Sequence, residues 1–272
     1  MIFGIWGEDK TGKTSLALTA PKPLVFMEFD IGGFNRAIWR FDGDYKSNLI
    51  RYESYPMPMQ FGTFDPSRLE LRPSKVVVGM KELFYRWASA YIKHLQDSSI
   101  ASIVIDTATL LYSITCDSYL QEKQEMQFDP KGNLLPNEKL RVQLAQIEYR
   151  EPNNRMRGII YNAKVASKNL ILVHHARDEY KPMLQRNGAI ANAATGKRER
   201  AGFATLGDSA DVIAYTWWQN TELDPKTKEI VKPAKPFCRV ELAGVKPLEG
   251  MAFQEPTFDK IDKVIRMVKG ME

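Results

Sequence analysis

An octapeptide near the start of the chain, Gly7-Glu8-Asp9-Lys10-Thr11-Gly12-Lys13-Thr14, constrains the fold more than any other feature. It follows a short apolar run, residues 2–6, whose β-branched and aromatic side chains are typical of a buried strand. It leads into residues 15–18, which have helical character. The spacing G-x-x-x-x-G-K-[ST] between a strand and a helix is the pattern of a loop whose backbone N–H groups wrap phosphate oxygens. The sequence therefore predicts a phosphate-binding strand–loop–helix unit, a P-loop.

Individual residues of this loop have separate predicted roles. Lys13 is expected to reach the terminal phosphates, and the Thr14 hydroxyl is expected to ligate Mg²⁺. The helix that begins near Lys13 directs the positive end of its dipole toward the anion. The predicted nucleotide-contacting set is the continuous run of Gly7, Glu8, Asp9, Lys10, Thr11, Gly12, Lys13, Thr14 and Ser15.

Apolar, strand-like segments alternate with helical segments along the rest of the chain. Strands are predicted over residues 24–27, 103–106, 170–173 and 210–218, and helices over residues 80–95, 109–127, 156–165 and 258–271. This alternation predicts βαβ units, that is, an α/β fold with a mainly parallel sheet flanked by helices. Residues 221–236 have turn chemistry and residues 237–242 return as a strand, which predicts an antiparallel hairpin at one edge. Residues 55–73, with four prolines, are expected to be an irregular connection.

Composition narrows the class of protein. Apolar residues make up 44% of the 272 residues and charged residues 26%, which excludes a chain too polar to fold. No linker divides it, so a single domain over 1–272 is predicted, with its core at about 1–218 and the edge hairpin and C-terminal helix at about 219–272. The net charge of +5 permits nucleic acid as a partner without requiring it. Two cysteines, no bilayer-length apolar run and no leader pattern predict a cytoplasmic protein without a membrane partner.

Carboxylates follow two of the predicted strands. Asp106 ends the strand at 103–106 and is the predicted residue that holds Mg²⁺ through water. Glu28 and Asp30 come at the end of the strand at 24–27, and since parallel strands end at the same edge, either carboxylate is placed near the phosphates. Asp30 is favoured as the general base because it lies further out toward the loop, and Glu28 remains the competing candidate.

Two histidines end the strand at 170–173. His175 is the predicted sensor of the γ-phosphate, which passes the state of the nucleotide to the segment that follows. The alternative is a purely structural role, as for most isolated histidines. Cys116 and Cys238 lie far from both histidines without metal-ligand spacing, so no zinc site is expected.

The order of these motifs resembles the core of RecA-type ATPases. The matching segments are the phosphate loop, residues 26–30, residues 103–107 and residues 172–177. The chain is more closely similar to phage-encoded, minimal RecA-like ATPases of single-strand annealing and recombination. The resemblance implies ATP and Mg²⁺ as cofactors, Asp30 as the residue that activates water, and His175 as the sensor in place of RecA's usual glutamine. It also implies a homo-oligomer, as a ring or a filament.

A basic segment follows the histidines. Residues 181–205 are predicted to form a long flexible loop that carries five cations: Lys181, Arg186, Lys197, Arg198 and Arg200. The resemblance implies that this loop contacts single-stranded DNA, and a mobile cationic segment suits that ligand. The alternative is a solvated loop without a ligand. A second basic group, Arg150, Arg155, Arg157, Lys164 and Lys168, is ambiguous between a DNA-binding surface and a solvated helix face.

Three functions compete on these observations. The leading one is a Mg²⁺-dependent ATPase that acts on single-stranded DNA in phage-type recombination or annealing, in the host cytoplasm, with a single-strand-binding protein as a further partner. The second is an ATP-switched module that binds DNA or a protein with negligible turnover. The third is a small-molecule phosphotransferase, for which the sequence shows no clear arginine-rich lid.

Overall fold

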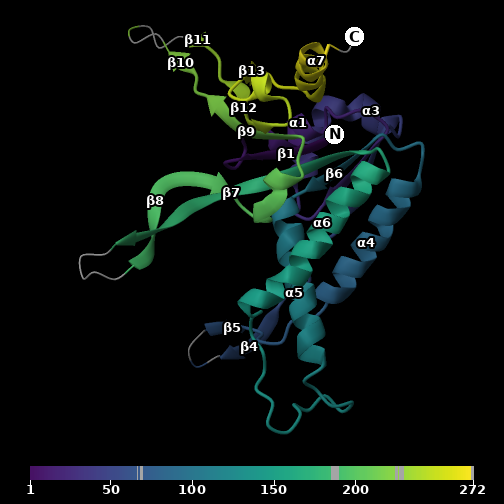
Figure 1. The fold of residues 1–272 in the computed structure, drawn as a ribbon, viewed down its shortest axis with the longest axis vertical. Helices are drawn as coiled ribbons and strands as arrows, with labels where there is room; N and C mark the ends of the chain where they lie inside the picture. The colour runs from purple at the N-terminus through teal and green to yellow at the C-terminus, as the bar shows by residue number, and fades with distance from the viewer. Residues whose placement is uncertain (66, 68–69, 185–189, 224–225, 227–229, 271–272) are drawn as a thin grey trace.

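The computed structural model of the chain describes residues 1–65, 67, 70–184, 190–223, 226 and 230–270. Its centre is a sheet with the strand order β13-β12-β9-β1-β7-β6-β2-β3, to which β8 is added by pairing with β7 (Figure 1). Strands β9, β1, β7, β6, β2 and β3 run parallel, and β12 and β13 add an antiparallel edge. The predicted fold class, a mainly parallel sheet with an antiparallel hairpin at one edge, is confirmed. The strands of this sheet are β1 (Ile2–Gly7), β2 (Leu24–Glu28), β3 (Ile50–Ser54), β6 (Ser102–Asp106), β7 (Asn169–Leu184), β8 (Ile190–Arg200), β9 (Val212–Gln219), β12 (Lys235–Ala243) and β13 (Ala252–Gln254).

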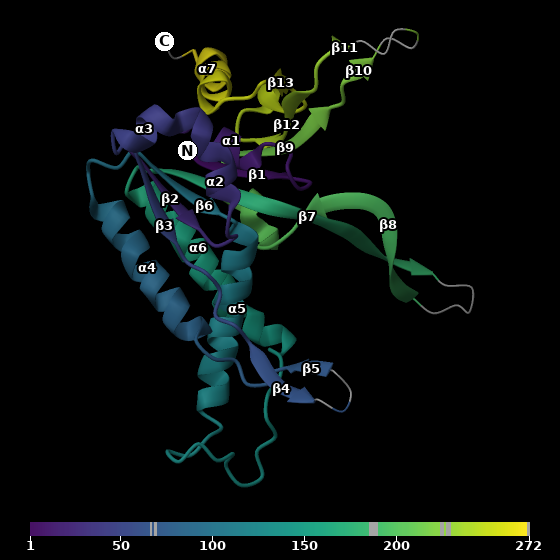
Figure 2. The ribbon, with the colours of Figure 1, turned by 180° about the vertical axis from the view of Figure 1, so that it is seen from behind.

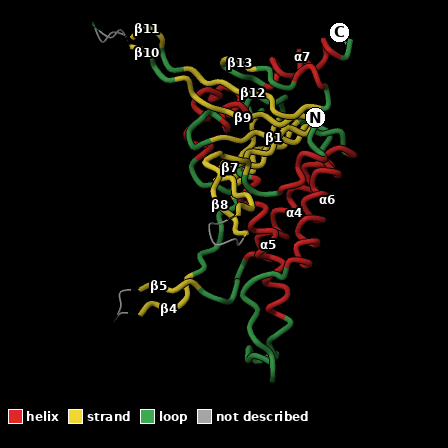
Figure 3. The backbone as a smooth tube through the Cα atoms, turned by 60° about the vertical axis from the view of Figure 1, so that its left-hand side comes forward, coloured by secondary structure: helices red, strands yellow, loops and turns green. Residues whose placement is uncertain are grey.

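Helices cover both faces of this sheet, as Figures 2 and 3 show. The long helices α4 (Met80–Gln96), α5 (Ala108–Glu125) and α6 (Arg150–Val165) share one apolar core with one side of the strands. The short helices α1 (Lys13–Ala17) and α2 (Gly33–Ala37) share the other core with α7 (Phe258–Val268). Successive residues of β2 alternate between these two cores, which explains why the central strands are apolar on both faces. No helix in the described ranges is long and apolar enough to cross a membrane.

The predicted long loop over residues 181–205 is wrong for residues 181–184 and 190–200, which form strands. Strand β7 continues past the sheet to Leu184, and β8 returns antiparallel beside it, with Ala176 opposite Arg200 and Leu184 opposite Ile190. Cross-strand ion pairs stabilise this β7–β8 ribbon, which projects from the molecule in Figure 1. The sequence pattern missed it because residues 176–184 and 190–200 contain few β-branched and aromatic residues, and each segment depends on the other for its hydrogen bonds.

Two other predicted connections also contain paired strands. The segment expected to be irregular, 55–73, includes β4 (Phe61–Asp65) and β5 (Glu70–Pro73), which pair antiparallel. The segment expected to be a turn, 221–236, includes β10 (Glu222–Leu223) and β11 (Ile230–Lys232) as a short pair. In Figures 1 and 2 both pairs project from the same side of the molecule as the β7–β8 ribbon.

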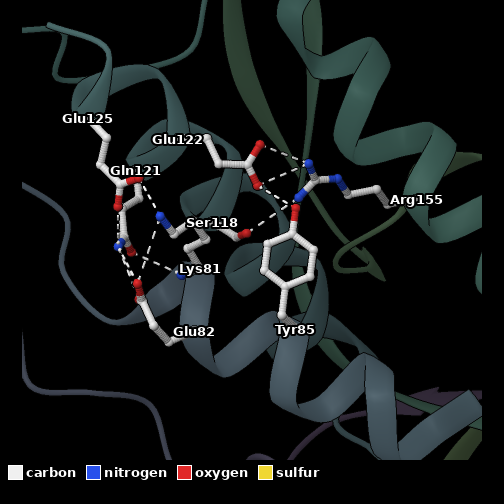
Figure 4. A network of polar contacts seen from close by, with 8 residues as sticks. All are labelled: Lys81, Glu82, Tyr85, Ser118, Gln121, Glu122, Glu125 and Arg155. Carbon is white, nitrogen blue, oxygen red and sulfur yellow. Dashed lines mark hydrogen bonds and ion pairs between the residues drawn. The ribbon is translucent and has the colours of Figure 1, made fainter.

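Polar contacts between the long helices account for part of the second basic group (Figure 4). Arg155 of α6 donates to both carboxylate oxygens of Glu122 in α5, at 3.0 and 3.1 Å, and its guanidinium lies over the ring of Phe84 in α4. Lys168 is buried, and its ammonium donates to the carbonyl oxygens of Asp97 and Ile100, both at 2.6 Å. These two cations are therefore part of the packing of the fold and are not a solvated face.

Candidate active site

The phosphate loop joins β1 to α1 in a conformation that requires its glycines. Gly12, at the start of α1, has φ of 89°, in the left-handed region. Gly7 lies against β9, and a Cβ atom there would stand 2.5 Å from the carbonyl oxygen of Thr216. The first intrahelical bond of α1 runs from the Leu16 N–H to the Gly12 carbonyl, so the N–H groups before Leu16 precede the helical ladder. This is the backbone arrangement that the spacing of the motif predicts.

Lys13 is held inside this loop. Its side chain is only 8% exposed, and its ammonium donates to the carbonyl oxygens of Gly7 at 2.8 Å and Glu8 at 2.5 Å. Burial lowers the pKa of the ammonium, and the carboxylates of Asp9 and Asp106 partly offset that effect. A phosphate group in the loop would therefore supply the counter-charge that this buried cation has only in part.

The two residues predicted to hold magnesium, Thr14 and Asp106, are in direct contact. The Thr14 hydroxyl donates to Oδ2 of Asp106, at the end of β6, at 2.7 Å. Asp106 is buried, and burial raises the pKa of its carboxyl to about 7, with a further contribution from Glu28 and Asp30. A divalent cation at this point would favour the ionised carboxylate.

These residues fit a magnesium ion bound together with a nucleotide. Mg²⁺ prefers oxygen ligands and keeps several waters, with one or two protein ligands and substrate phosphates completing its coordination. The hydroxyl of Thr14 and the carboxylate of Asp106 are oxygen donors of this kind, on neighbouring ends of α1 and β6.

The two candidate general bases have different surroundings. Glu28 is 1% exposed, and both of its carboxylate oxygens accept hydrogen bonds, from the Phe34 N–H at 2.7 Å and from the Tyr52 hydroxyl at 2.6 Å. Asp30 lies beyond the end of β2, and its side chain is half-exposed and lines the cleft described below. The structure thus gives Glu28 a supporting position and leaves Asp30 open to a ligand.

The two histidines at the end of the sheet point into different environments. The His175 ring lies 3.4 Å, from Nε2 to Oδ2, from Asp30, and its backbone N–H donates to the Thr109 hydroxyl at 3.0 Å. His174 is buried, its Nδ1 lies 3.1 Å from the carbonyl oxygen of Ala201, and burial lowers the pKa of its ring well below the usual value. Only His175 is therefore placed with the candidate catalytic groups.

A cleft of about 530 Å³ brings most of the predicted residues together. It also includes residues that the sequence analysis missed, on α2, on the 3₁₀ turn η1 (Ile38–Phe41) and at the end of β9. Trp218 of β9 is fixed to the loop by a hydrogen bond from its indole N–H to the Lys10 carbonyl, at 2.7 Å. The cleft is lined by Asp9, Lys10, Thr11, Gly12, Lys13, Thr14, Ser15, Asp30, Gly33, Arg36, Ala37, Arg40, Asp106, Thr107, His175, Ala176 and Trp218.

Four of the predicted DNA-contacting cations, Lys181, Lys197, Arg198 and Arg200, lie on the ribbon, and none of these four lines the cleft. Lys181 and Lys197 are exposed, and Lys181 pairs with Glu179 at 2.9 Å. Arg198 reaches back to Glu8 of the loop, and Arg200 donates to the carbonyl oxygens of Phe203 and Ala204. Burial lowers the pKa of the Arg200 guanidinium to about 10. The fifth predicted cation, Arg186, lies outside the described residues.

Comparison with known proteins gives a family match over most of the chain. A family model described as an AAA domain matches residues 1–215, a span that contains every residue around the cleft except Trp218. Among solved structures, the chain is similar to a KaiC-like protein from the hyperthermophilic archaeon Pyrococcus horikoshii, at 11% identity and a TM-score of 0.44, over 93% of this chain and 83% of that one. No curated protein matches the chain.

Proposed function

This chain belongs to the AAA-domain family, and on that premise we propose that it is a Mg²⁺-dependent ATPase of the RecA-like type. The observation that carries the proposal is the hydrogen bond between Thr14 and Asp106. It joins the phosphate loop to the acidic strand end that P-loop ATPases use for the metal. Lys13, Asp30 and His175 line or border the same cleft.

In this proposal, each residue of the phosphate loop and of the end of β6 has a separate role in hydrolysis. The N–H groups of the loop and the Lys13 ammonium bind the β- and γ-phosphates. Thr14 would ligate a magnesium ion and Asp106 would hold it through water, and the ion would neutralise charge on the phosphate oxygens. These interactions position the nucleotide and stabilise the charge that develops during transfer.

Asp30 is the favoured general base. It accepts a proton from the water that attacks the γ-phosphorus, while the bond from the γ-phosphorus to the bridging oxygen breaks and leaves ADP and phosphate. Glu28 is less suited to this step because both of its oxygens already accept hydrogen bonds. His175, 3.4 Å from Asp30, is positioned to respond to the γ-phosphate or its loss.

We extend the proposal to single-stranded DNA on the β7–β8 ribbon, in recombination or annealing, as the resemblance to phage RecA-like ATPases implies. Two observations support it. The ribbon begins immediately after His175, and its Arg198 forms an ion pair with Glu8 of the phosphate loop. The ribbon is therefore connected to the proposed nucleotide site at two places. Exposed lysines, Lys181 and Lys197, provide charge for a phosphate backbone. A homo-oligomer and a single-strand-binding protein remain proposed partners.

The first experiment is steady-state phosphate release from ATP with and without single-stranded DNA, with the Lys13→Ala variant as the blank. Stimulation by single strands and not by duplex supports the whole proposal. Turnover that DNA does not change removes the DNA part and favours a phosphotransferase or another ATP-driven activity. ATP binding without turnover removes hydrolysis and favours the ATP-switched binding module.

A further inference from the structure

Two arginines line the cleft and have no role in the site described so far. Arg36 lies in α2 and Arg40 in η1, four residues apart, which places them one turn apart on one side of this segment. Neither forms an ion pair with a residue in the described ranges. The Arg40 guanidinium lies 5.0 Å from the centroid of the neighbouring Trp39 ring. Arg36 thus brings an unmatched positive charge to the cleft.

Arg36 is exposed, and its guanidinium lies beside the turn that precedes α2. Its Nη1 atom lies only 3.2 Å from the point where a Cβ atom on Gly32 would stand. A Cβ atom on the next residue, Gly33, would lie 3.3 Å from Oδ2 of Asp106 and 3.7 Å from the Thr14 hydroxyl. The guanidinium therefore lies beside the same short turn, Gly32-Gly33, that borders the predicted magnesium ligands.

Glu28 fixes the helix that carries Arg36. One Glu28 oxygen accepts the backbone N–H of Phe34, the second residue of α2, and the other accepts the hydroxyl of Tyr52. The Phe34 and Tyr52 rings stack with centroids 4.3 Å apart, and Phe34 is buried. Because α2 is tied to β2 and β3 in this way, Arg36, two residues after Phe34, is presented from a rigid support.

We propose that Arg36 contacts the γ-phosphate and stabilises the transition state of hydrolysis from within the same chain. This inference rests on the proposed ATPase function. Charge develops on the γ-phosphate oxygens and on the bridging oxygen as the bond from the γ-phosphorus to the bridging oxygen breaks, and a guanidinium fork donates to two such oxygens at once. Arg40, further along the segment, is exposed and lies over the exposed ring of Trp39.

The kinetic test compares Arg36→Ala, Arg36→Lys and Arg40→Ala with the wild type. Arginines that stabilise phosphoryl transfer contribute about 10³–10⁵-fold to kcat, so Arg36→Ala is expected to lower kcat by on the order of 10³-fold. Its affinity for ADP should stay unchanged, because ADP lacks the γ-phosphate. Arg36→Lys keeps the charge and loses the fork, so it should recover only a small part of the activity, and Arg40→Ala should have the smaller effect. Arg157→Ala, an exposed arginine of α6, is the matched control expected to leave activity unchanged.

A binding measurement separates this inference from the proposed function. Calorimetric titration with a non-hydrolysable ATP analogue and with ADP gives the preference of each variant for the triphosphate. Arg36→Ala should lose this preference, whether or not the wild type turns over. If the wild type does not hydrolyse ATP and Arg36→Ala still loses the preference, the ATPase proposal fails and the Arg36 contact stands. Equal kcat and equal preference in Arg36→Ala and the wild type would overturn the Arg36 inference alone.

Discussion

Arg198 of the β7–β8 ribbon donates to both carboxylate oxygens of Glu8 in the phosphate loop, from Nε at 2.6 Å and from Nη2 at 3.1 Å. A third donor of the same guanidinium contacts Asp178 on the neighbouring strand, at 2.5 Å. One side chain therefore links the two strands of the ribbon to the residue that follows Gly7. Phosphates in the loop would repel the Glu8 carboxylate and attract the guanidinium. Nucleotide binding in the loop and DNA binding on the ribbon are therefore expected to affect each other reciprocally.

The ribbon lysines provide the cleanest test of DNA binding. Lys181→Glu with Lys197→Glu should weaken single-stranded DNA binding and leave ATP affinity unchanged, because neither side chain lines the cleft. The dependence of log K on log salt should become shallower by about 0.7 for each DNA phosphate that the variant no longer neutralises. Fluorescence anisotropy at several salt concentrations measures both effects. Lys263→Glu with Arg266→Glu in α7 is the control, and an equal reduction in that variant would refute a specific role of the ribbon. Arg198→Glu, by contrast, should disturb both ligands.

The buried carboxyl of Asp106 makes the nucleotide-free protein sensitive to pH. Its pKa is raised to about 7, so the folded state holds a proton that the unfolded chain has already released. The free energy of unfolding should therefore fall as the pH rises from about 4 to about 7 and then level off with respect to this group. Asp106→Asn should remove that dependence and raise the free energy of unfolding at pH 8 by on the order of 1 kcal/mol, while it abolishes hydrolysis. Urea unfolding of both proteins at pH 5 and pH 8 measures the difference, and an identical pH dependence in the variant would contradict it.

Gly33 leaves little room beside the predicted metal ligands. A Cβ atom there would lie 3.3 Å from both Oδ2 of Asp106 and Oε1 of Glu28. Gly33→Ala should weaken Mg²⁺-dependent ATP binding by about tenfold, which corresponds to about 1.4 kcal/mol, with little loss of stability because alanine suits a helix. The matched control is Gly43→Ala in α3 (Asp42–Lys46), where no atom lies within 4 Å of the added Cβ. Titration calorimetry with ATP is done with and without Mg²⁺. A loss of affinity only in the presence of Mg²⁺ indicates an effect on the metal site, and an equal loss in its absence would contradict the prediction.

Substitutions of Asp30 and of Glu28 should have different effects, the first mainly on kcat and the second mainly on stability. Asp30→Asn should lower kcat by about 10²–10⁴-fold with ATP affinity unchanged, since it removes a proton acceptor whose ion-pair contact is with His175 of the same site. Glu28→Gln replaces an acceptor of two hydrogen bonds by an amide with a single oxygen, and it should lower the melting temperature more than Asp30→Asn does. Phosphate release and thermal unfolding of both variants check the assignment. If Glu28→Gln loses turnover and Asp30→Asn keeps it, the general base is Glu28.

Much of the site was predictable from residues close together in the sequence. The loop, the strand before it and the acid that ends β6 all follow from local spacing and from the alternation of strands and helices. The different roles of Glu28 and Asp30 were not predictable. They depend on hydrogen bonds to Glu28 from Tyr52 of β3 and Phe34 of α2, which no local sequence pattern connects to Glu28. Arg36 was missed for the same reason, since its place beside the metal ligands depends on how α2 packs.

Local spacing was sufficient to specify the phosphate loop and the polar ends of the parallel strands, because backbone geometry within a few residues depends on their own conformational preferences. The packed fold was needed to establish that residues 176–184 and 190–200 pair as a ribbon, and that Arg198 lies on Glu8. The paired residues of the ribbon lie 6 to 24 positions apart in the chain, and Glu8 and Arg198 lie 190 positions apart. The formation of these contacts depends on the free energy of the whole packed sheet, which no short stretch of sequence contains.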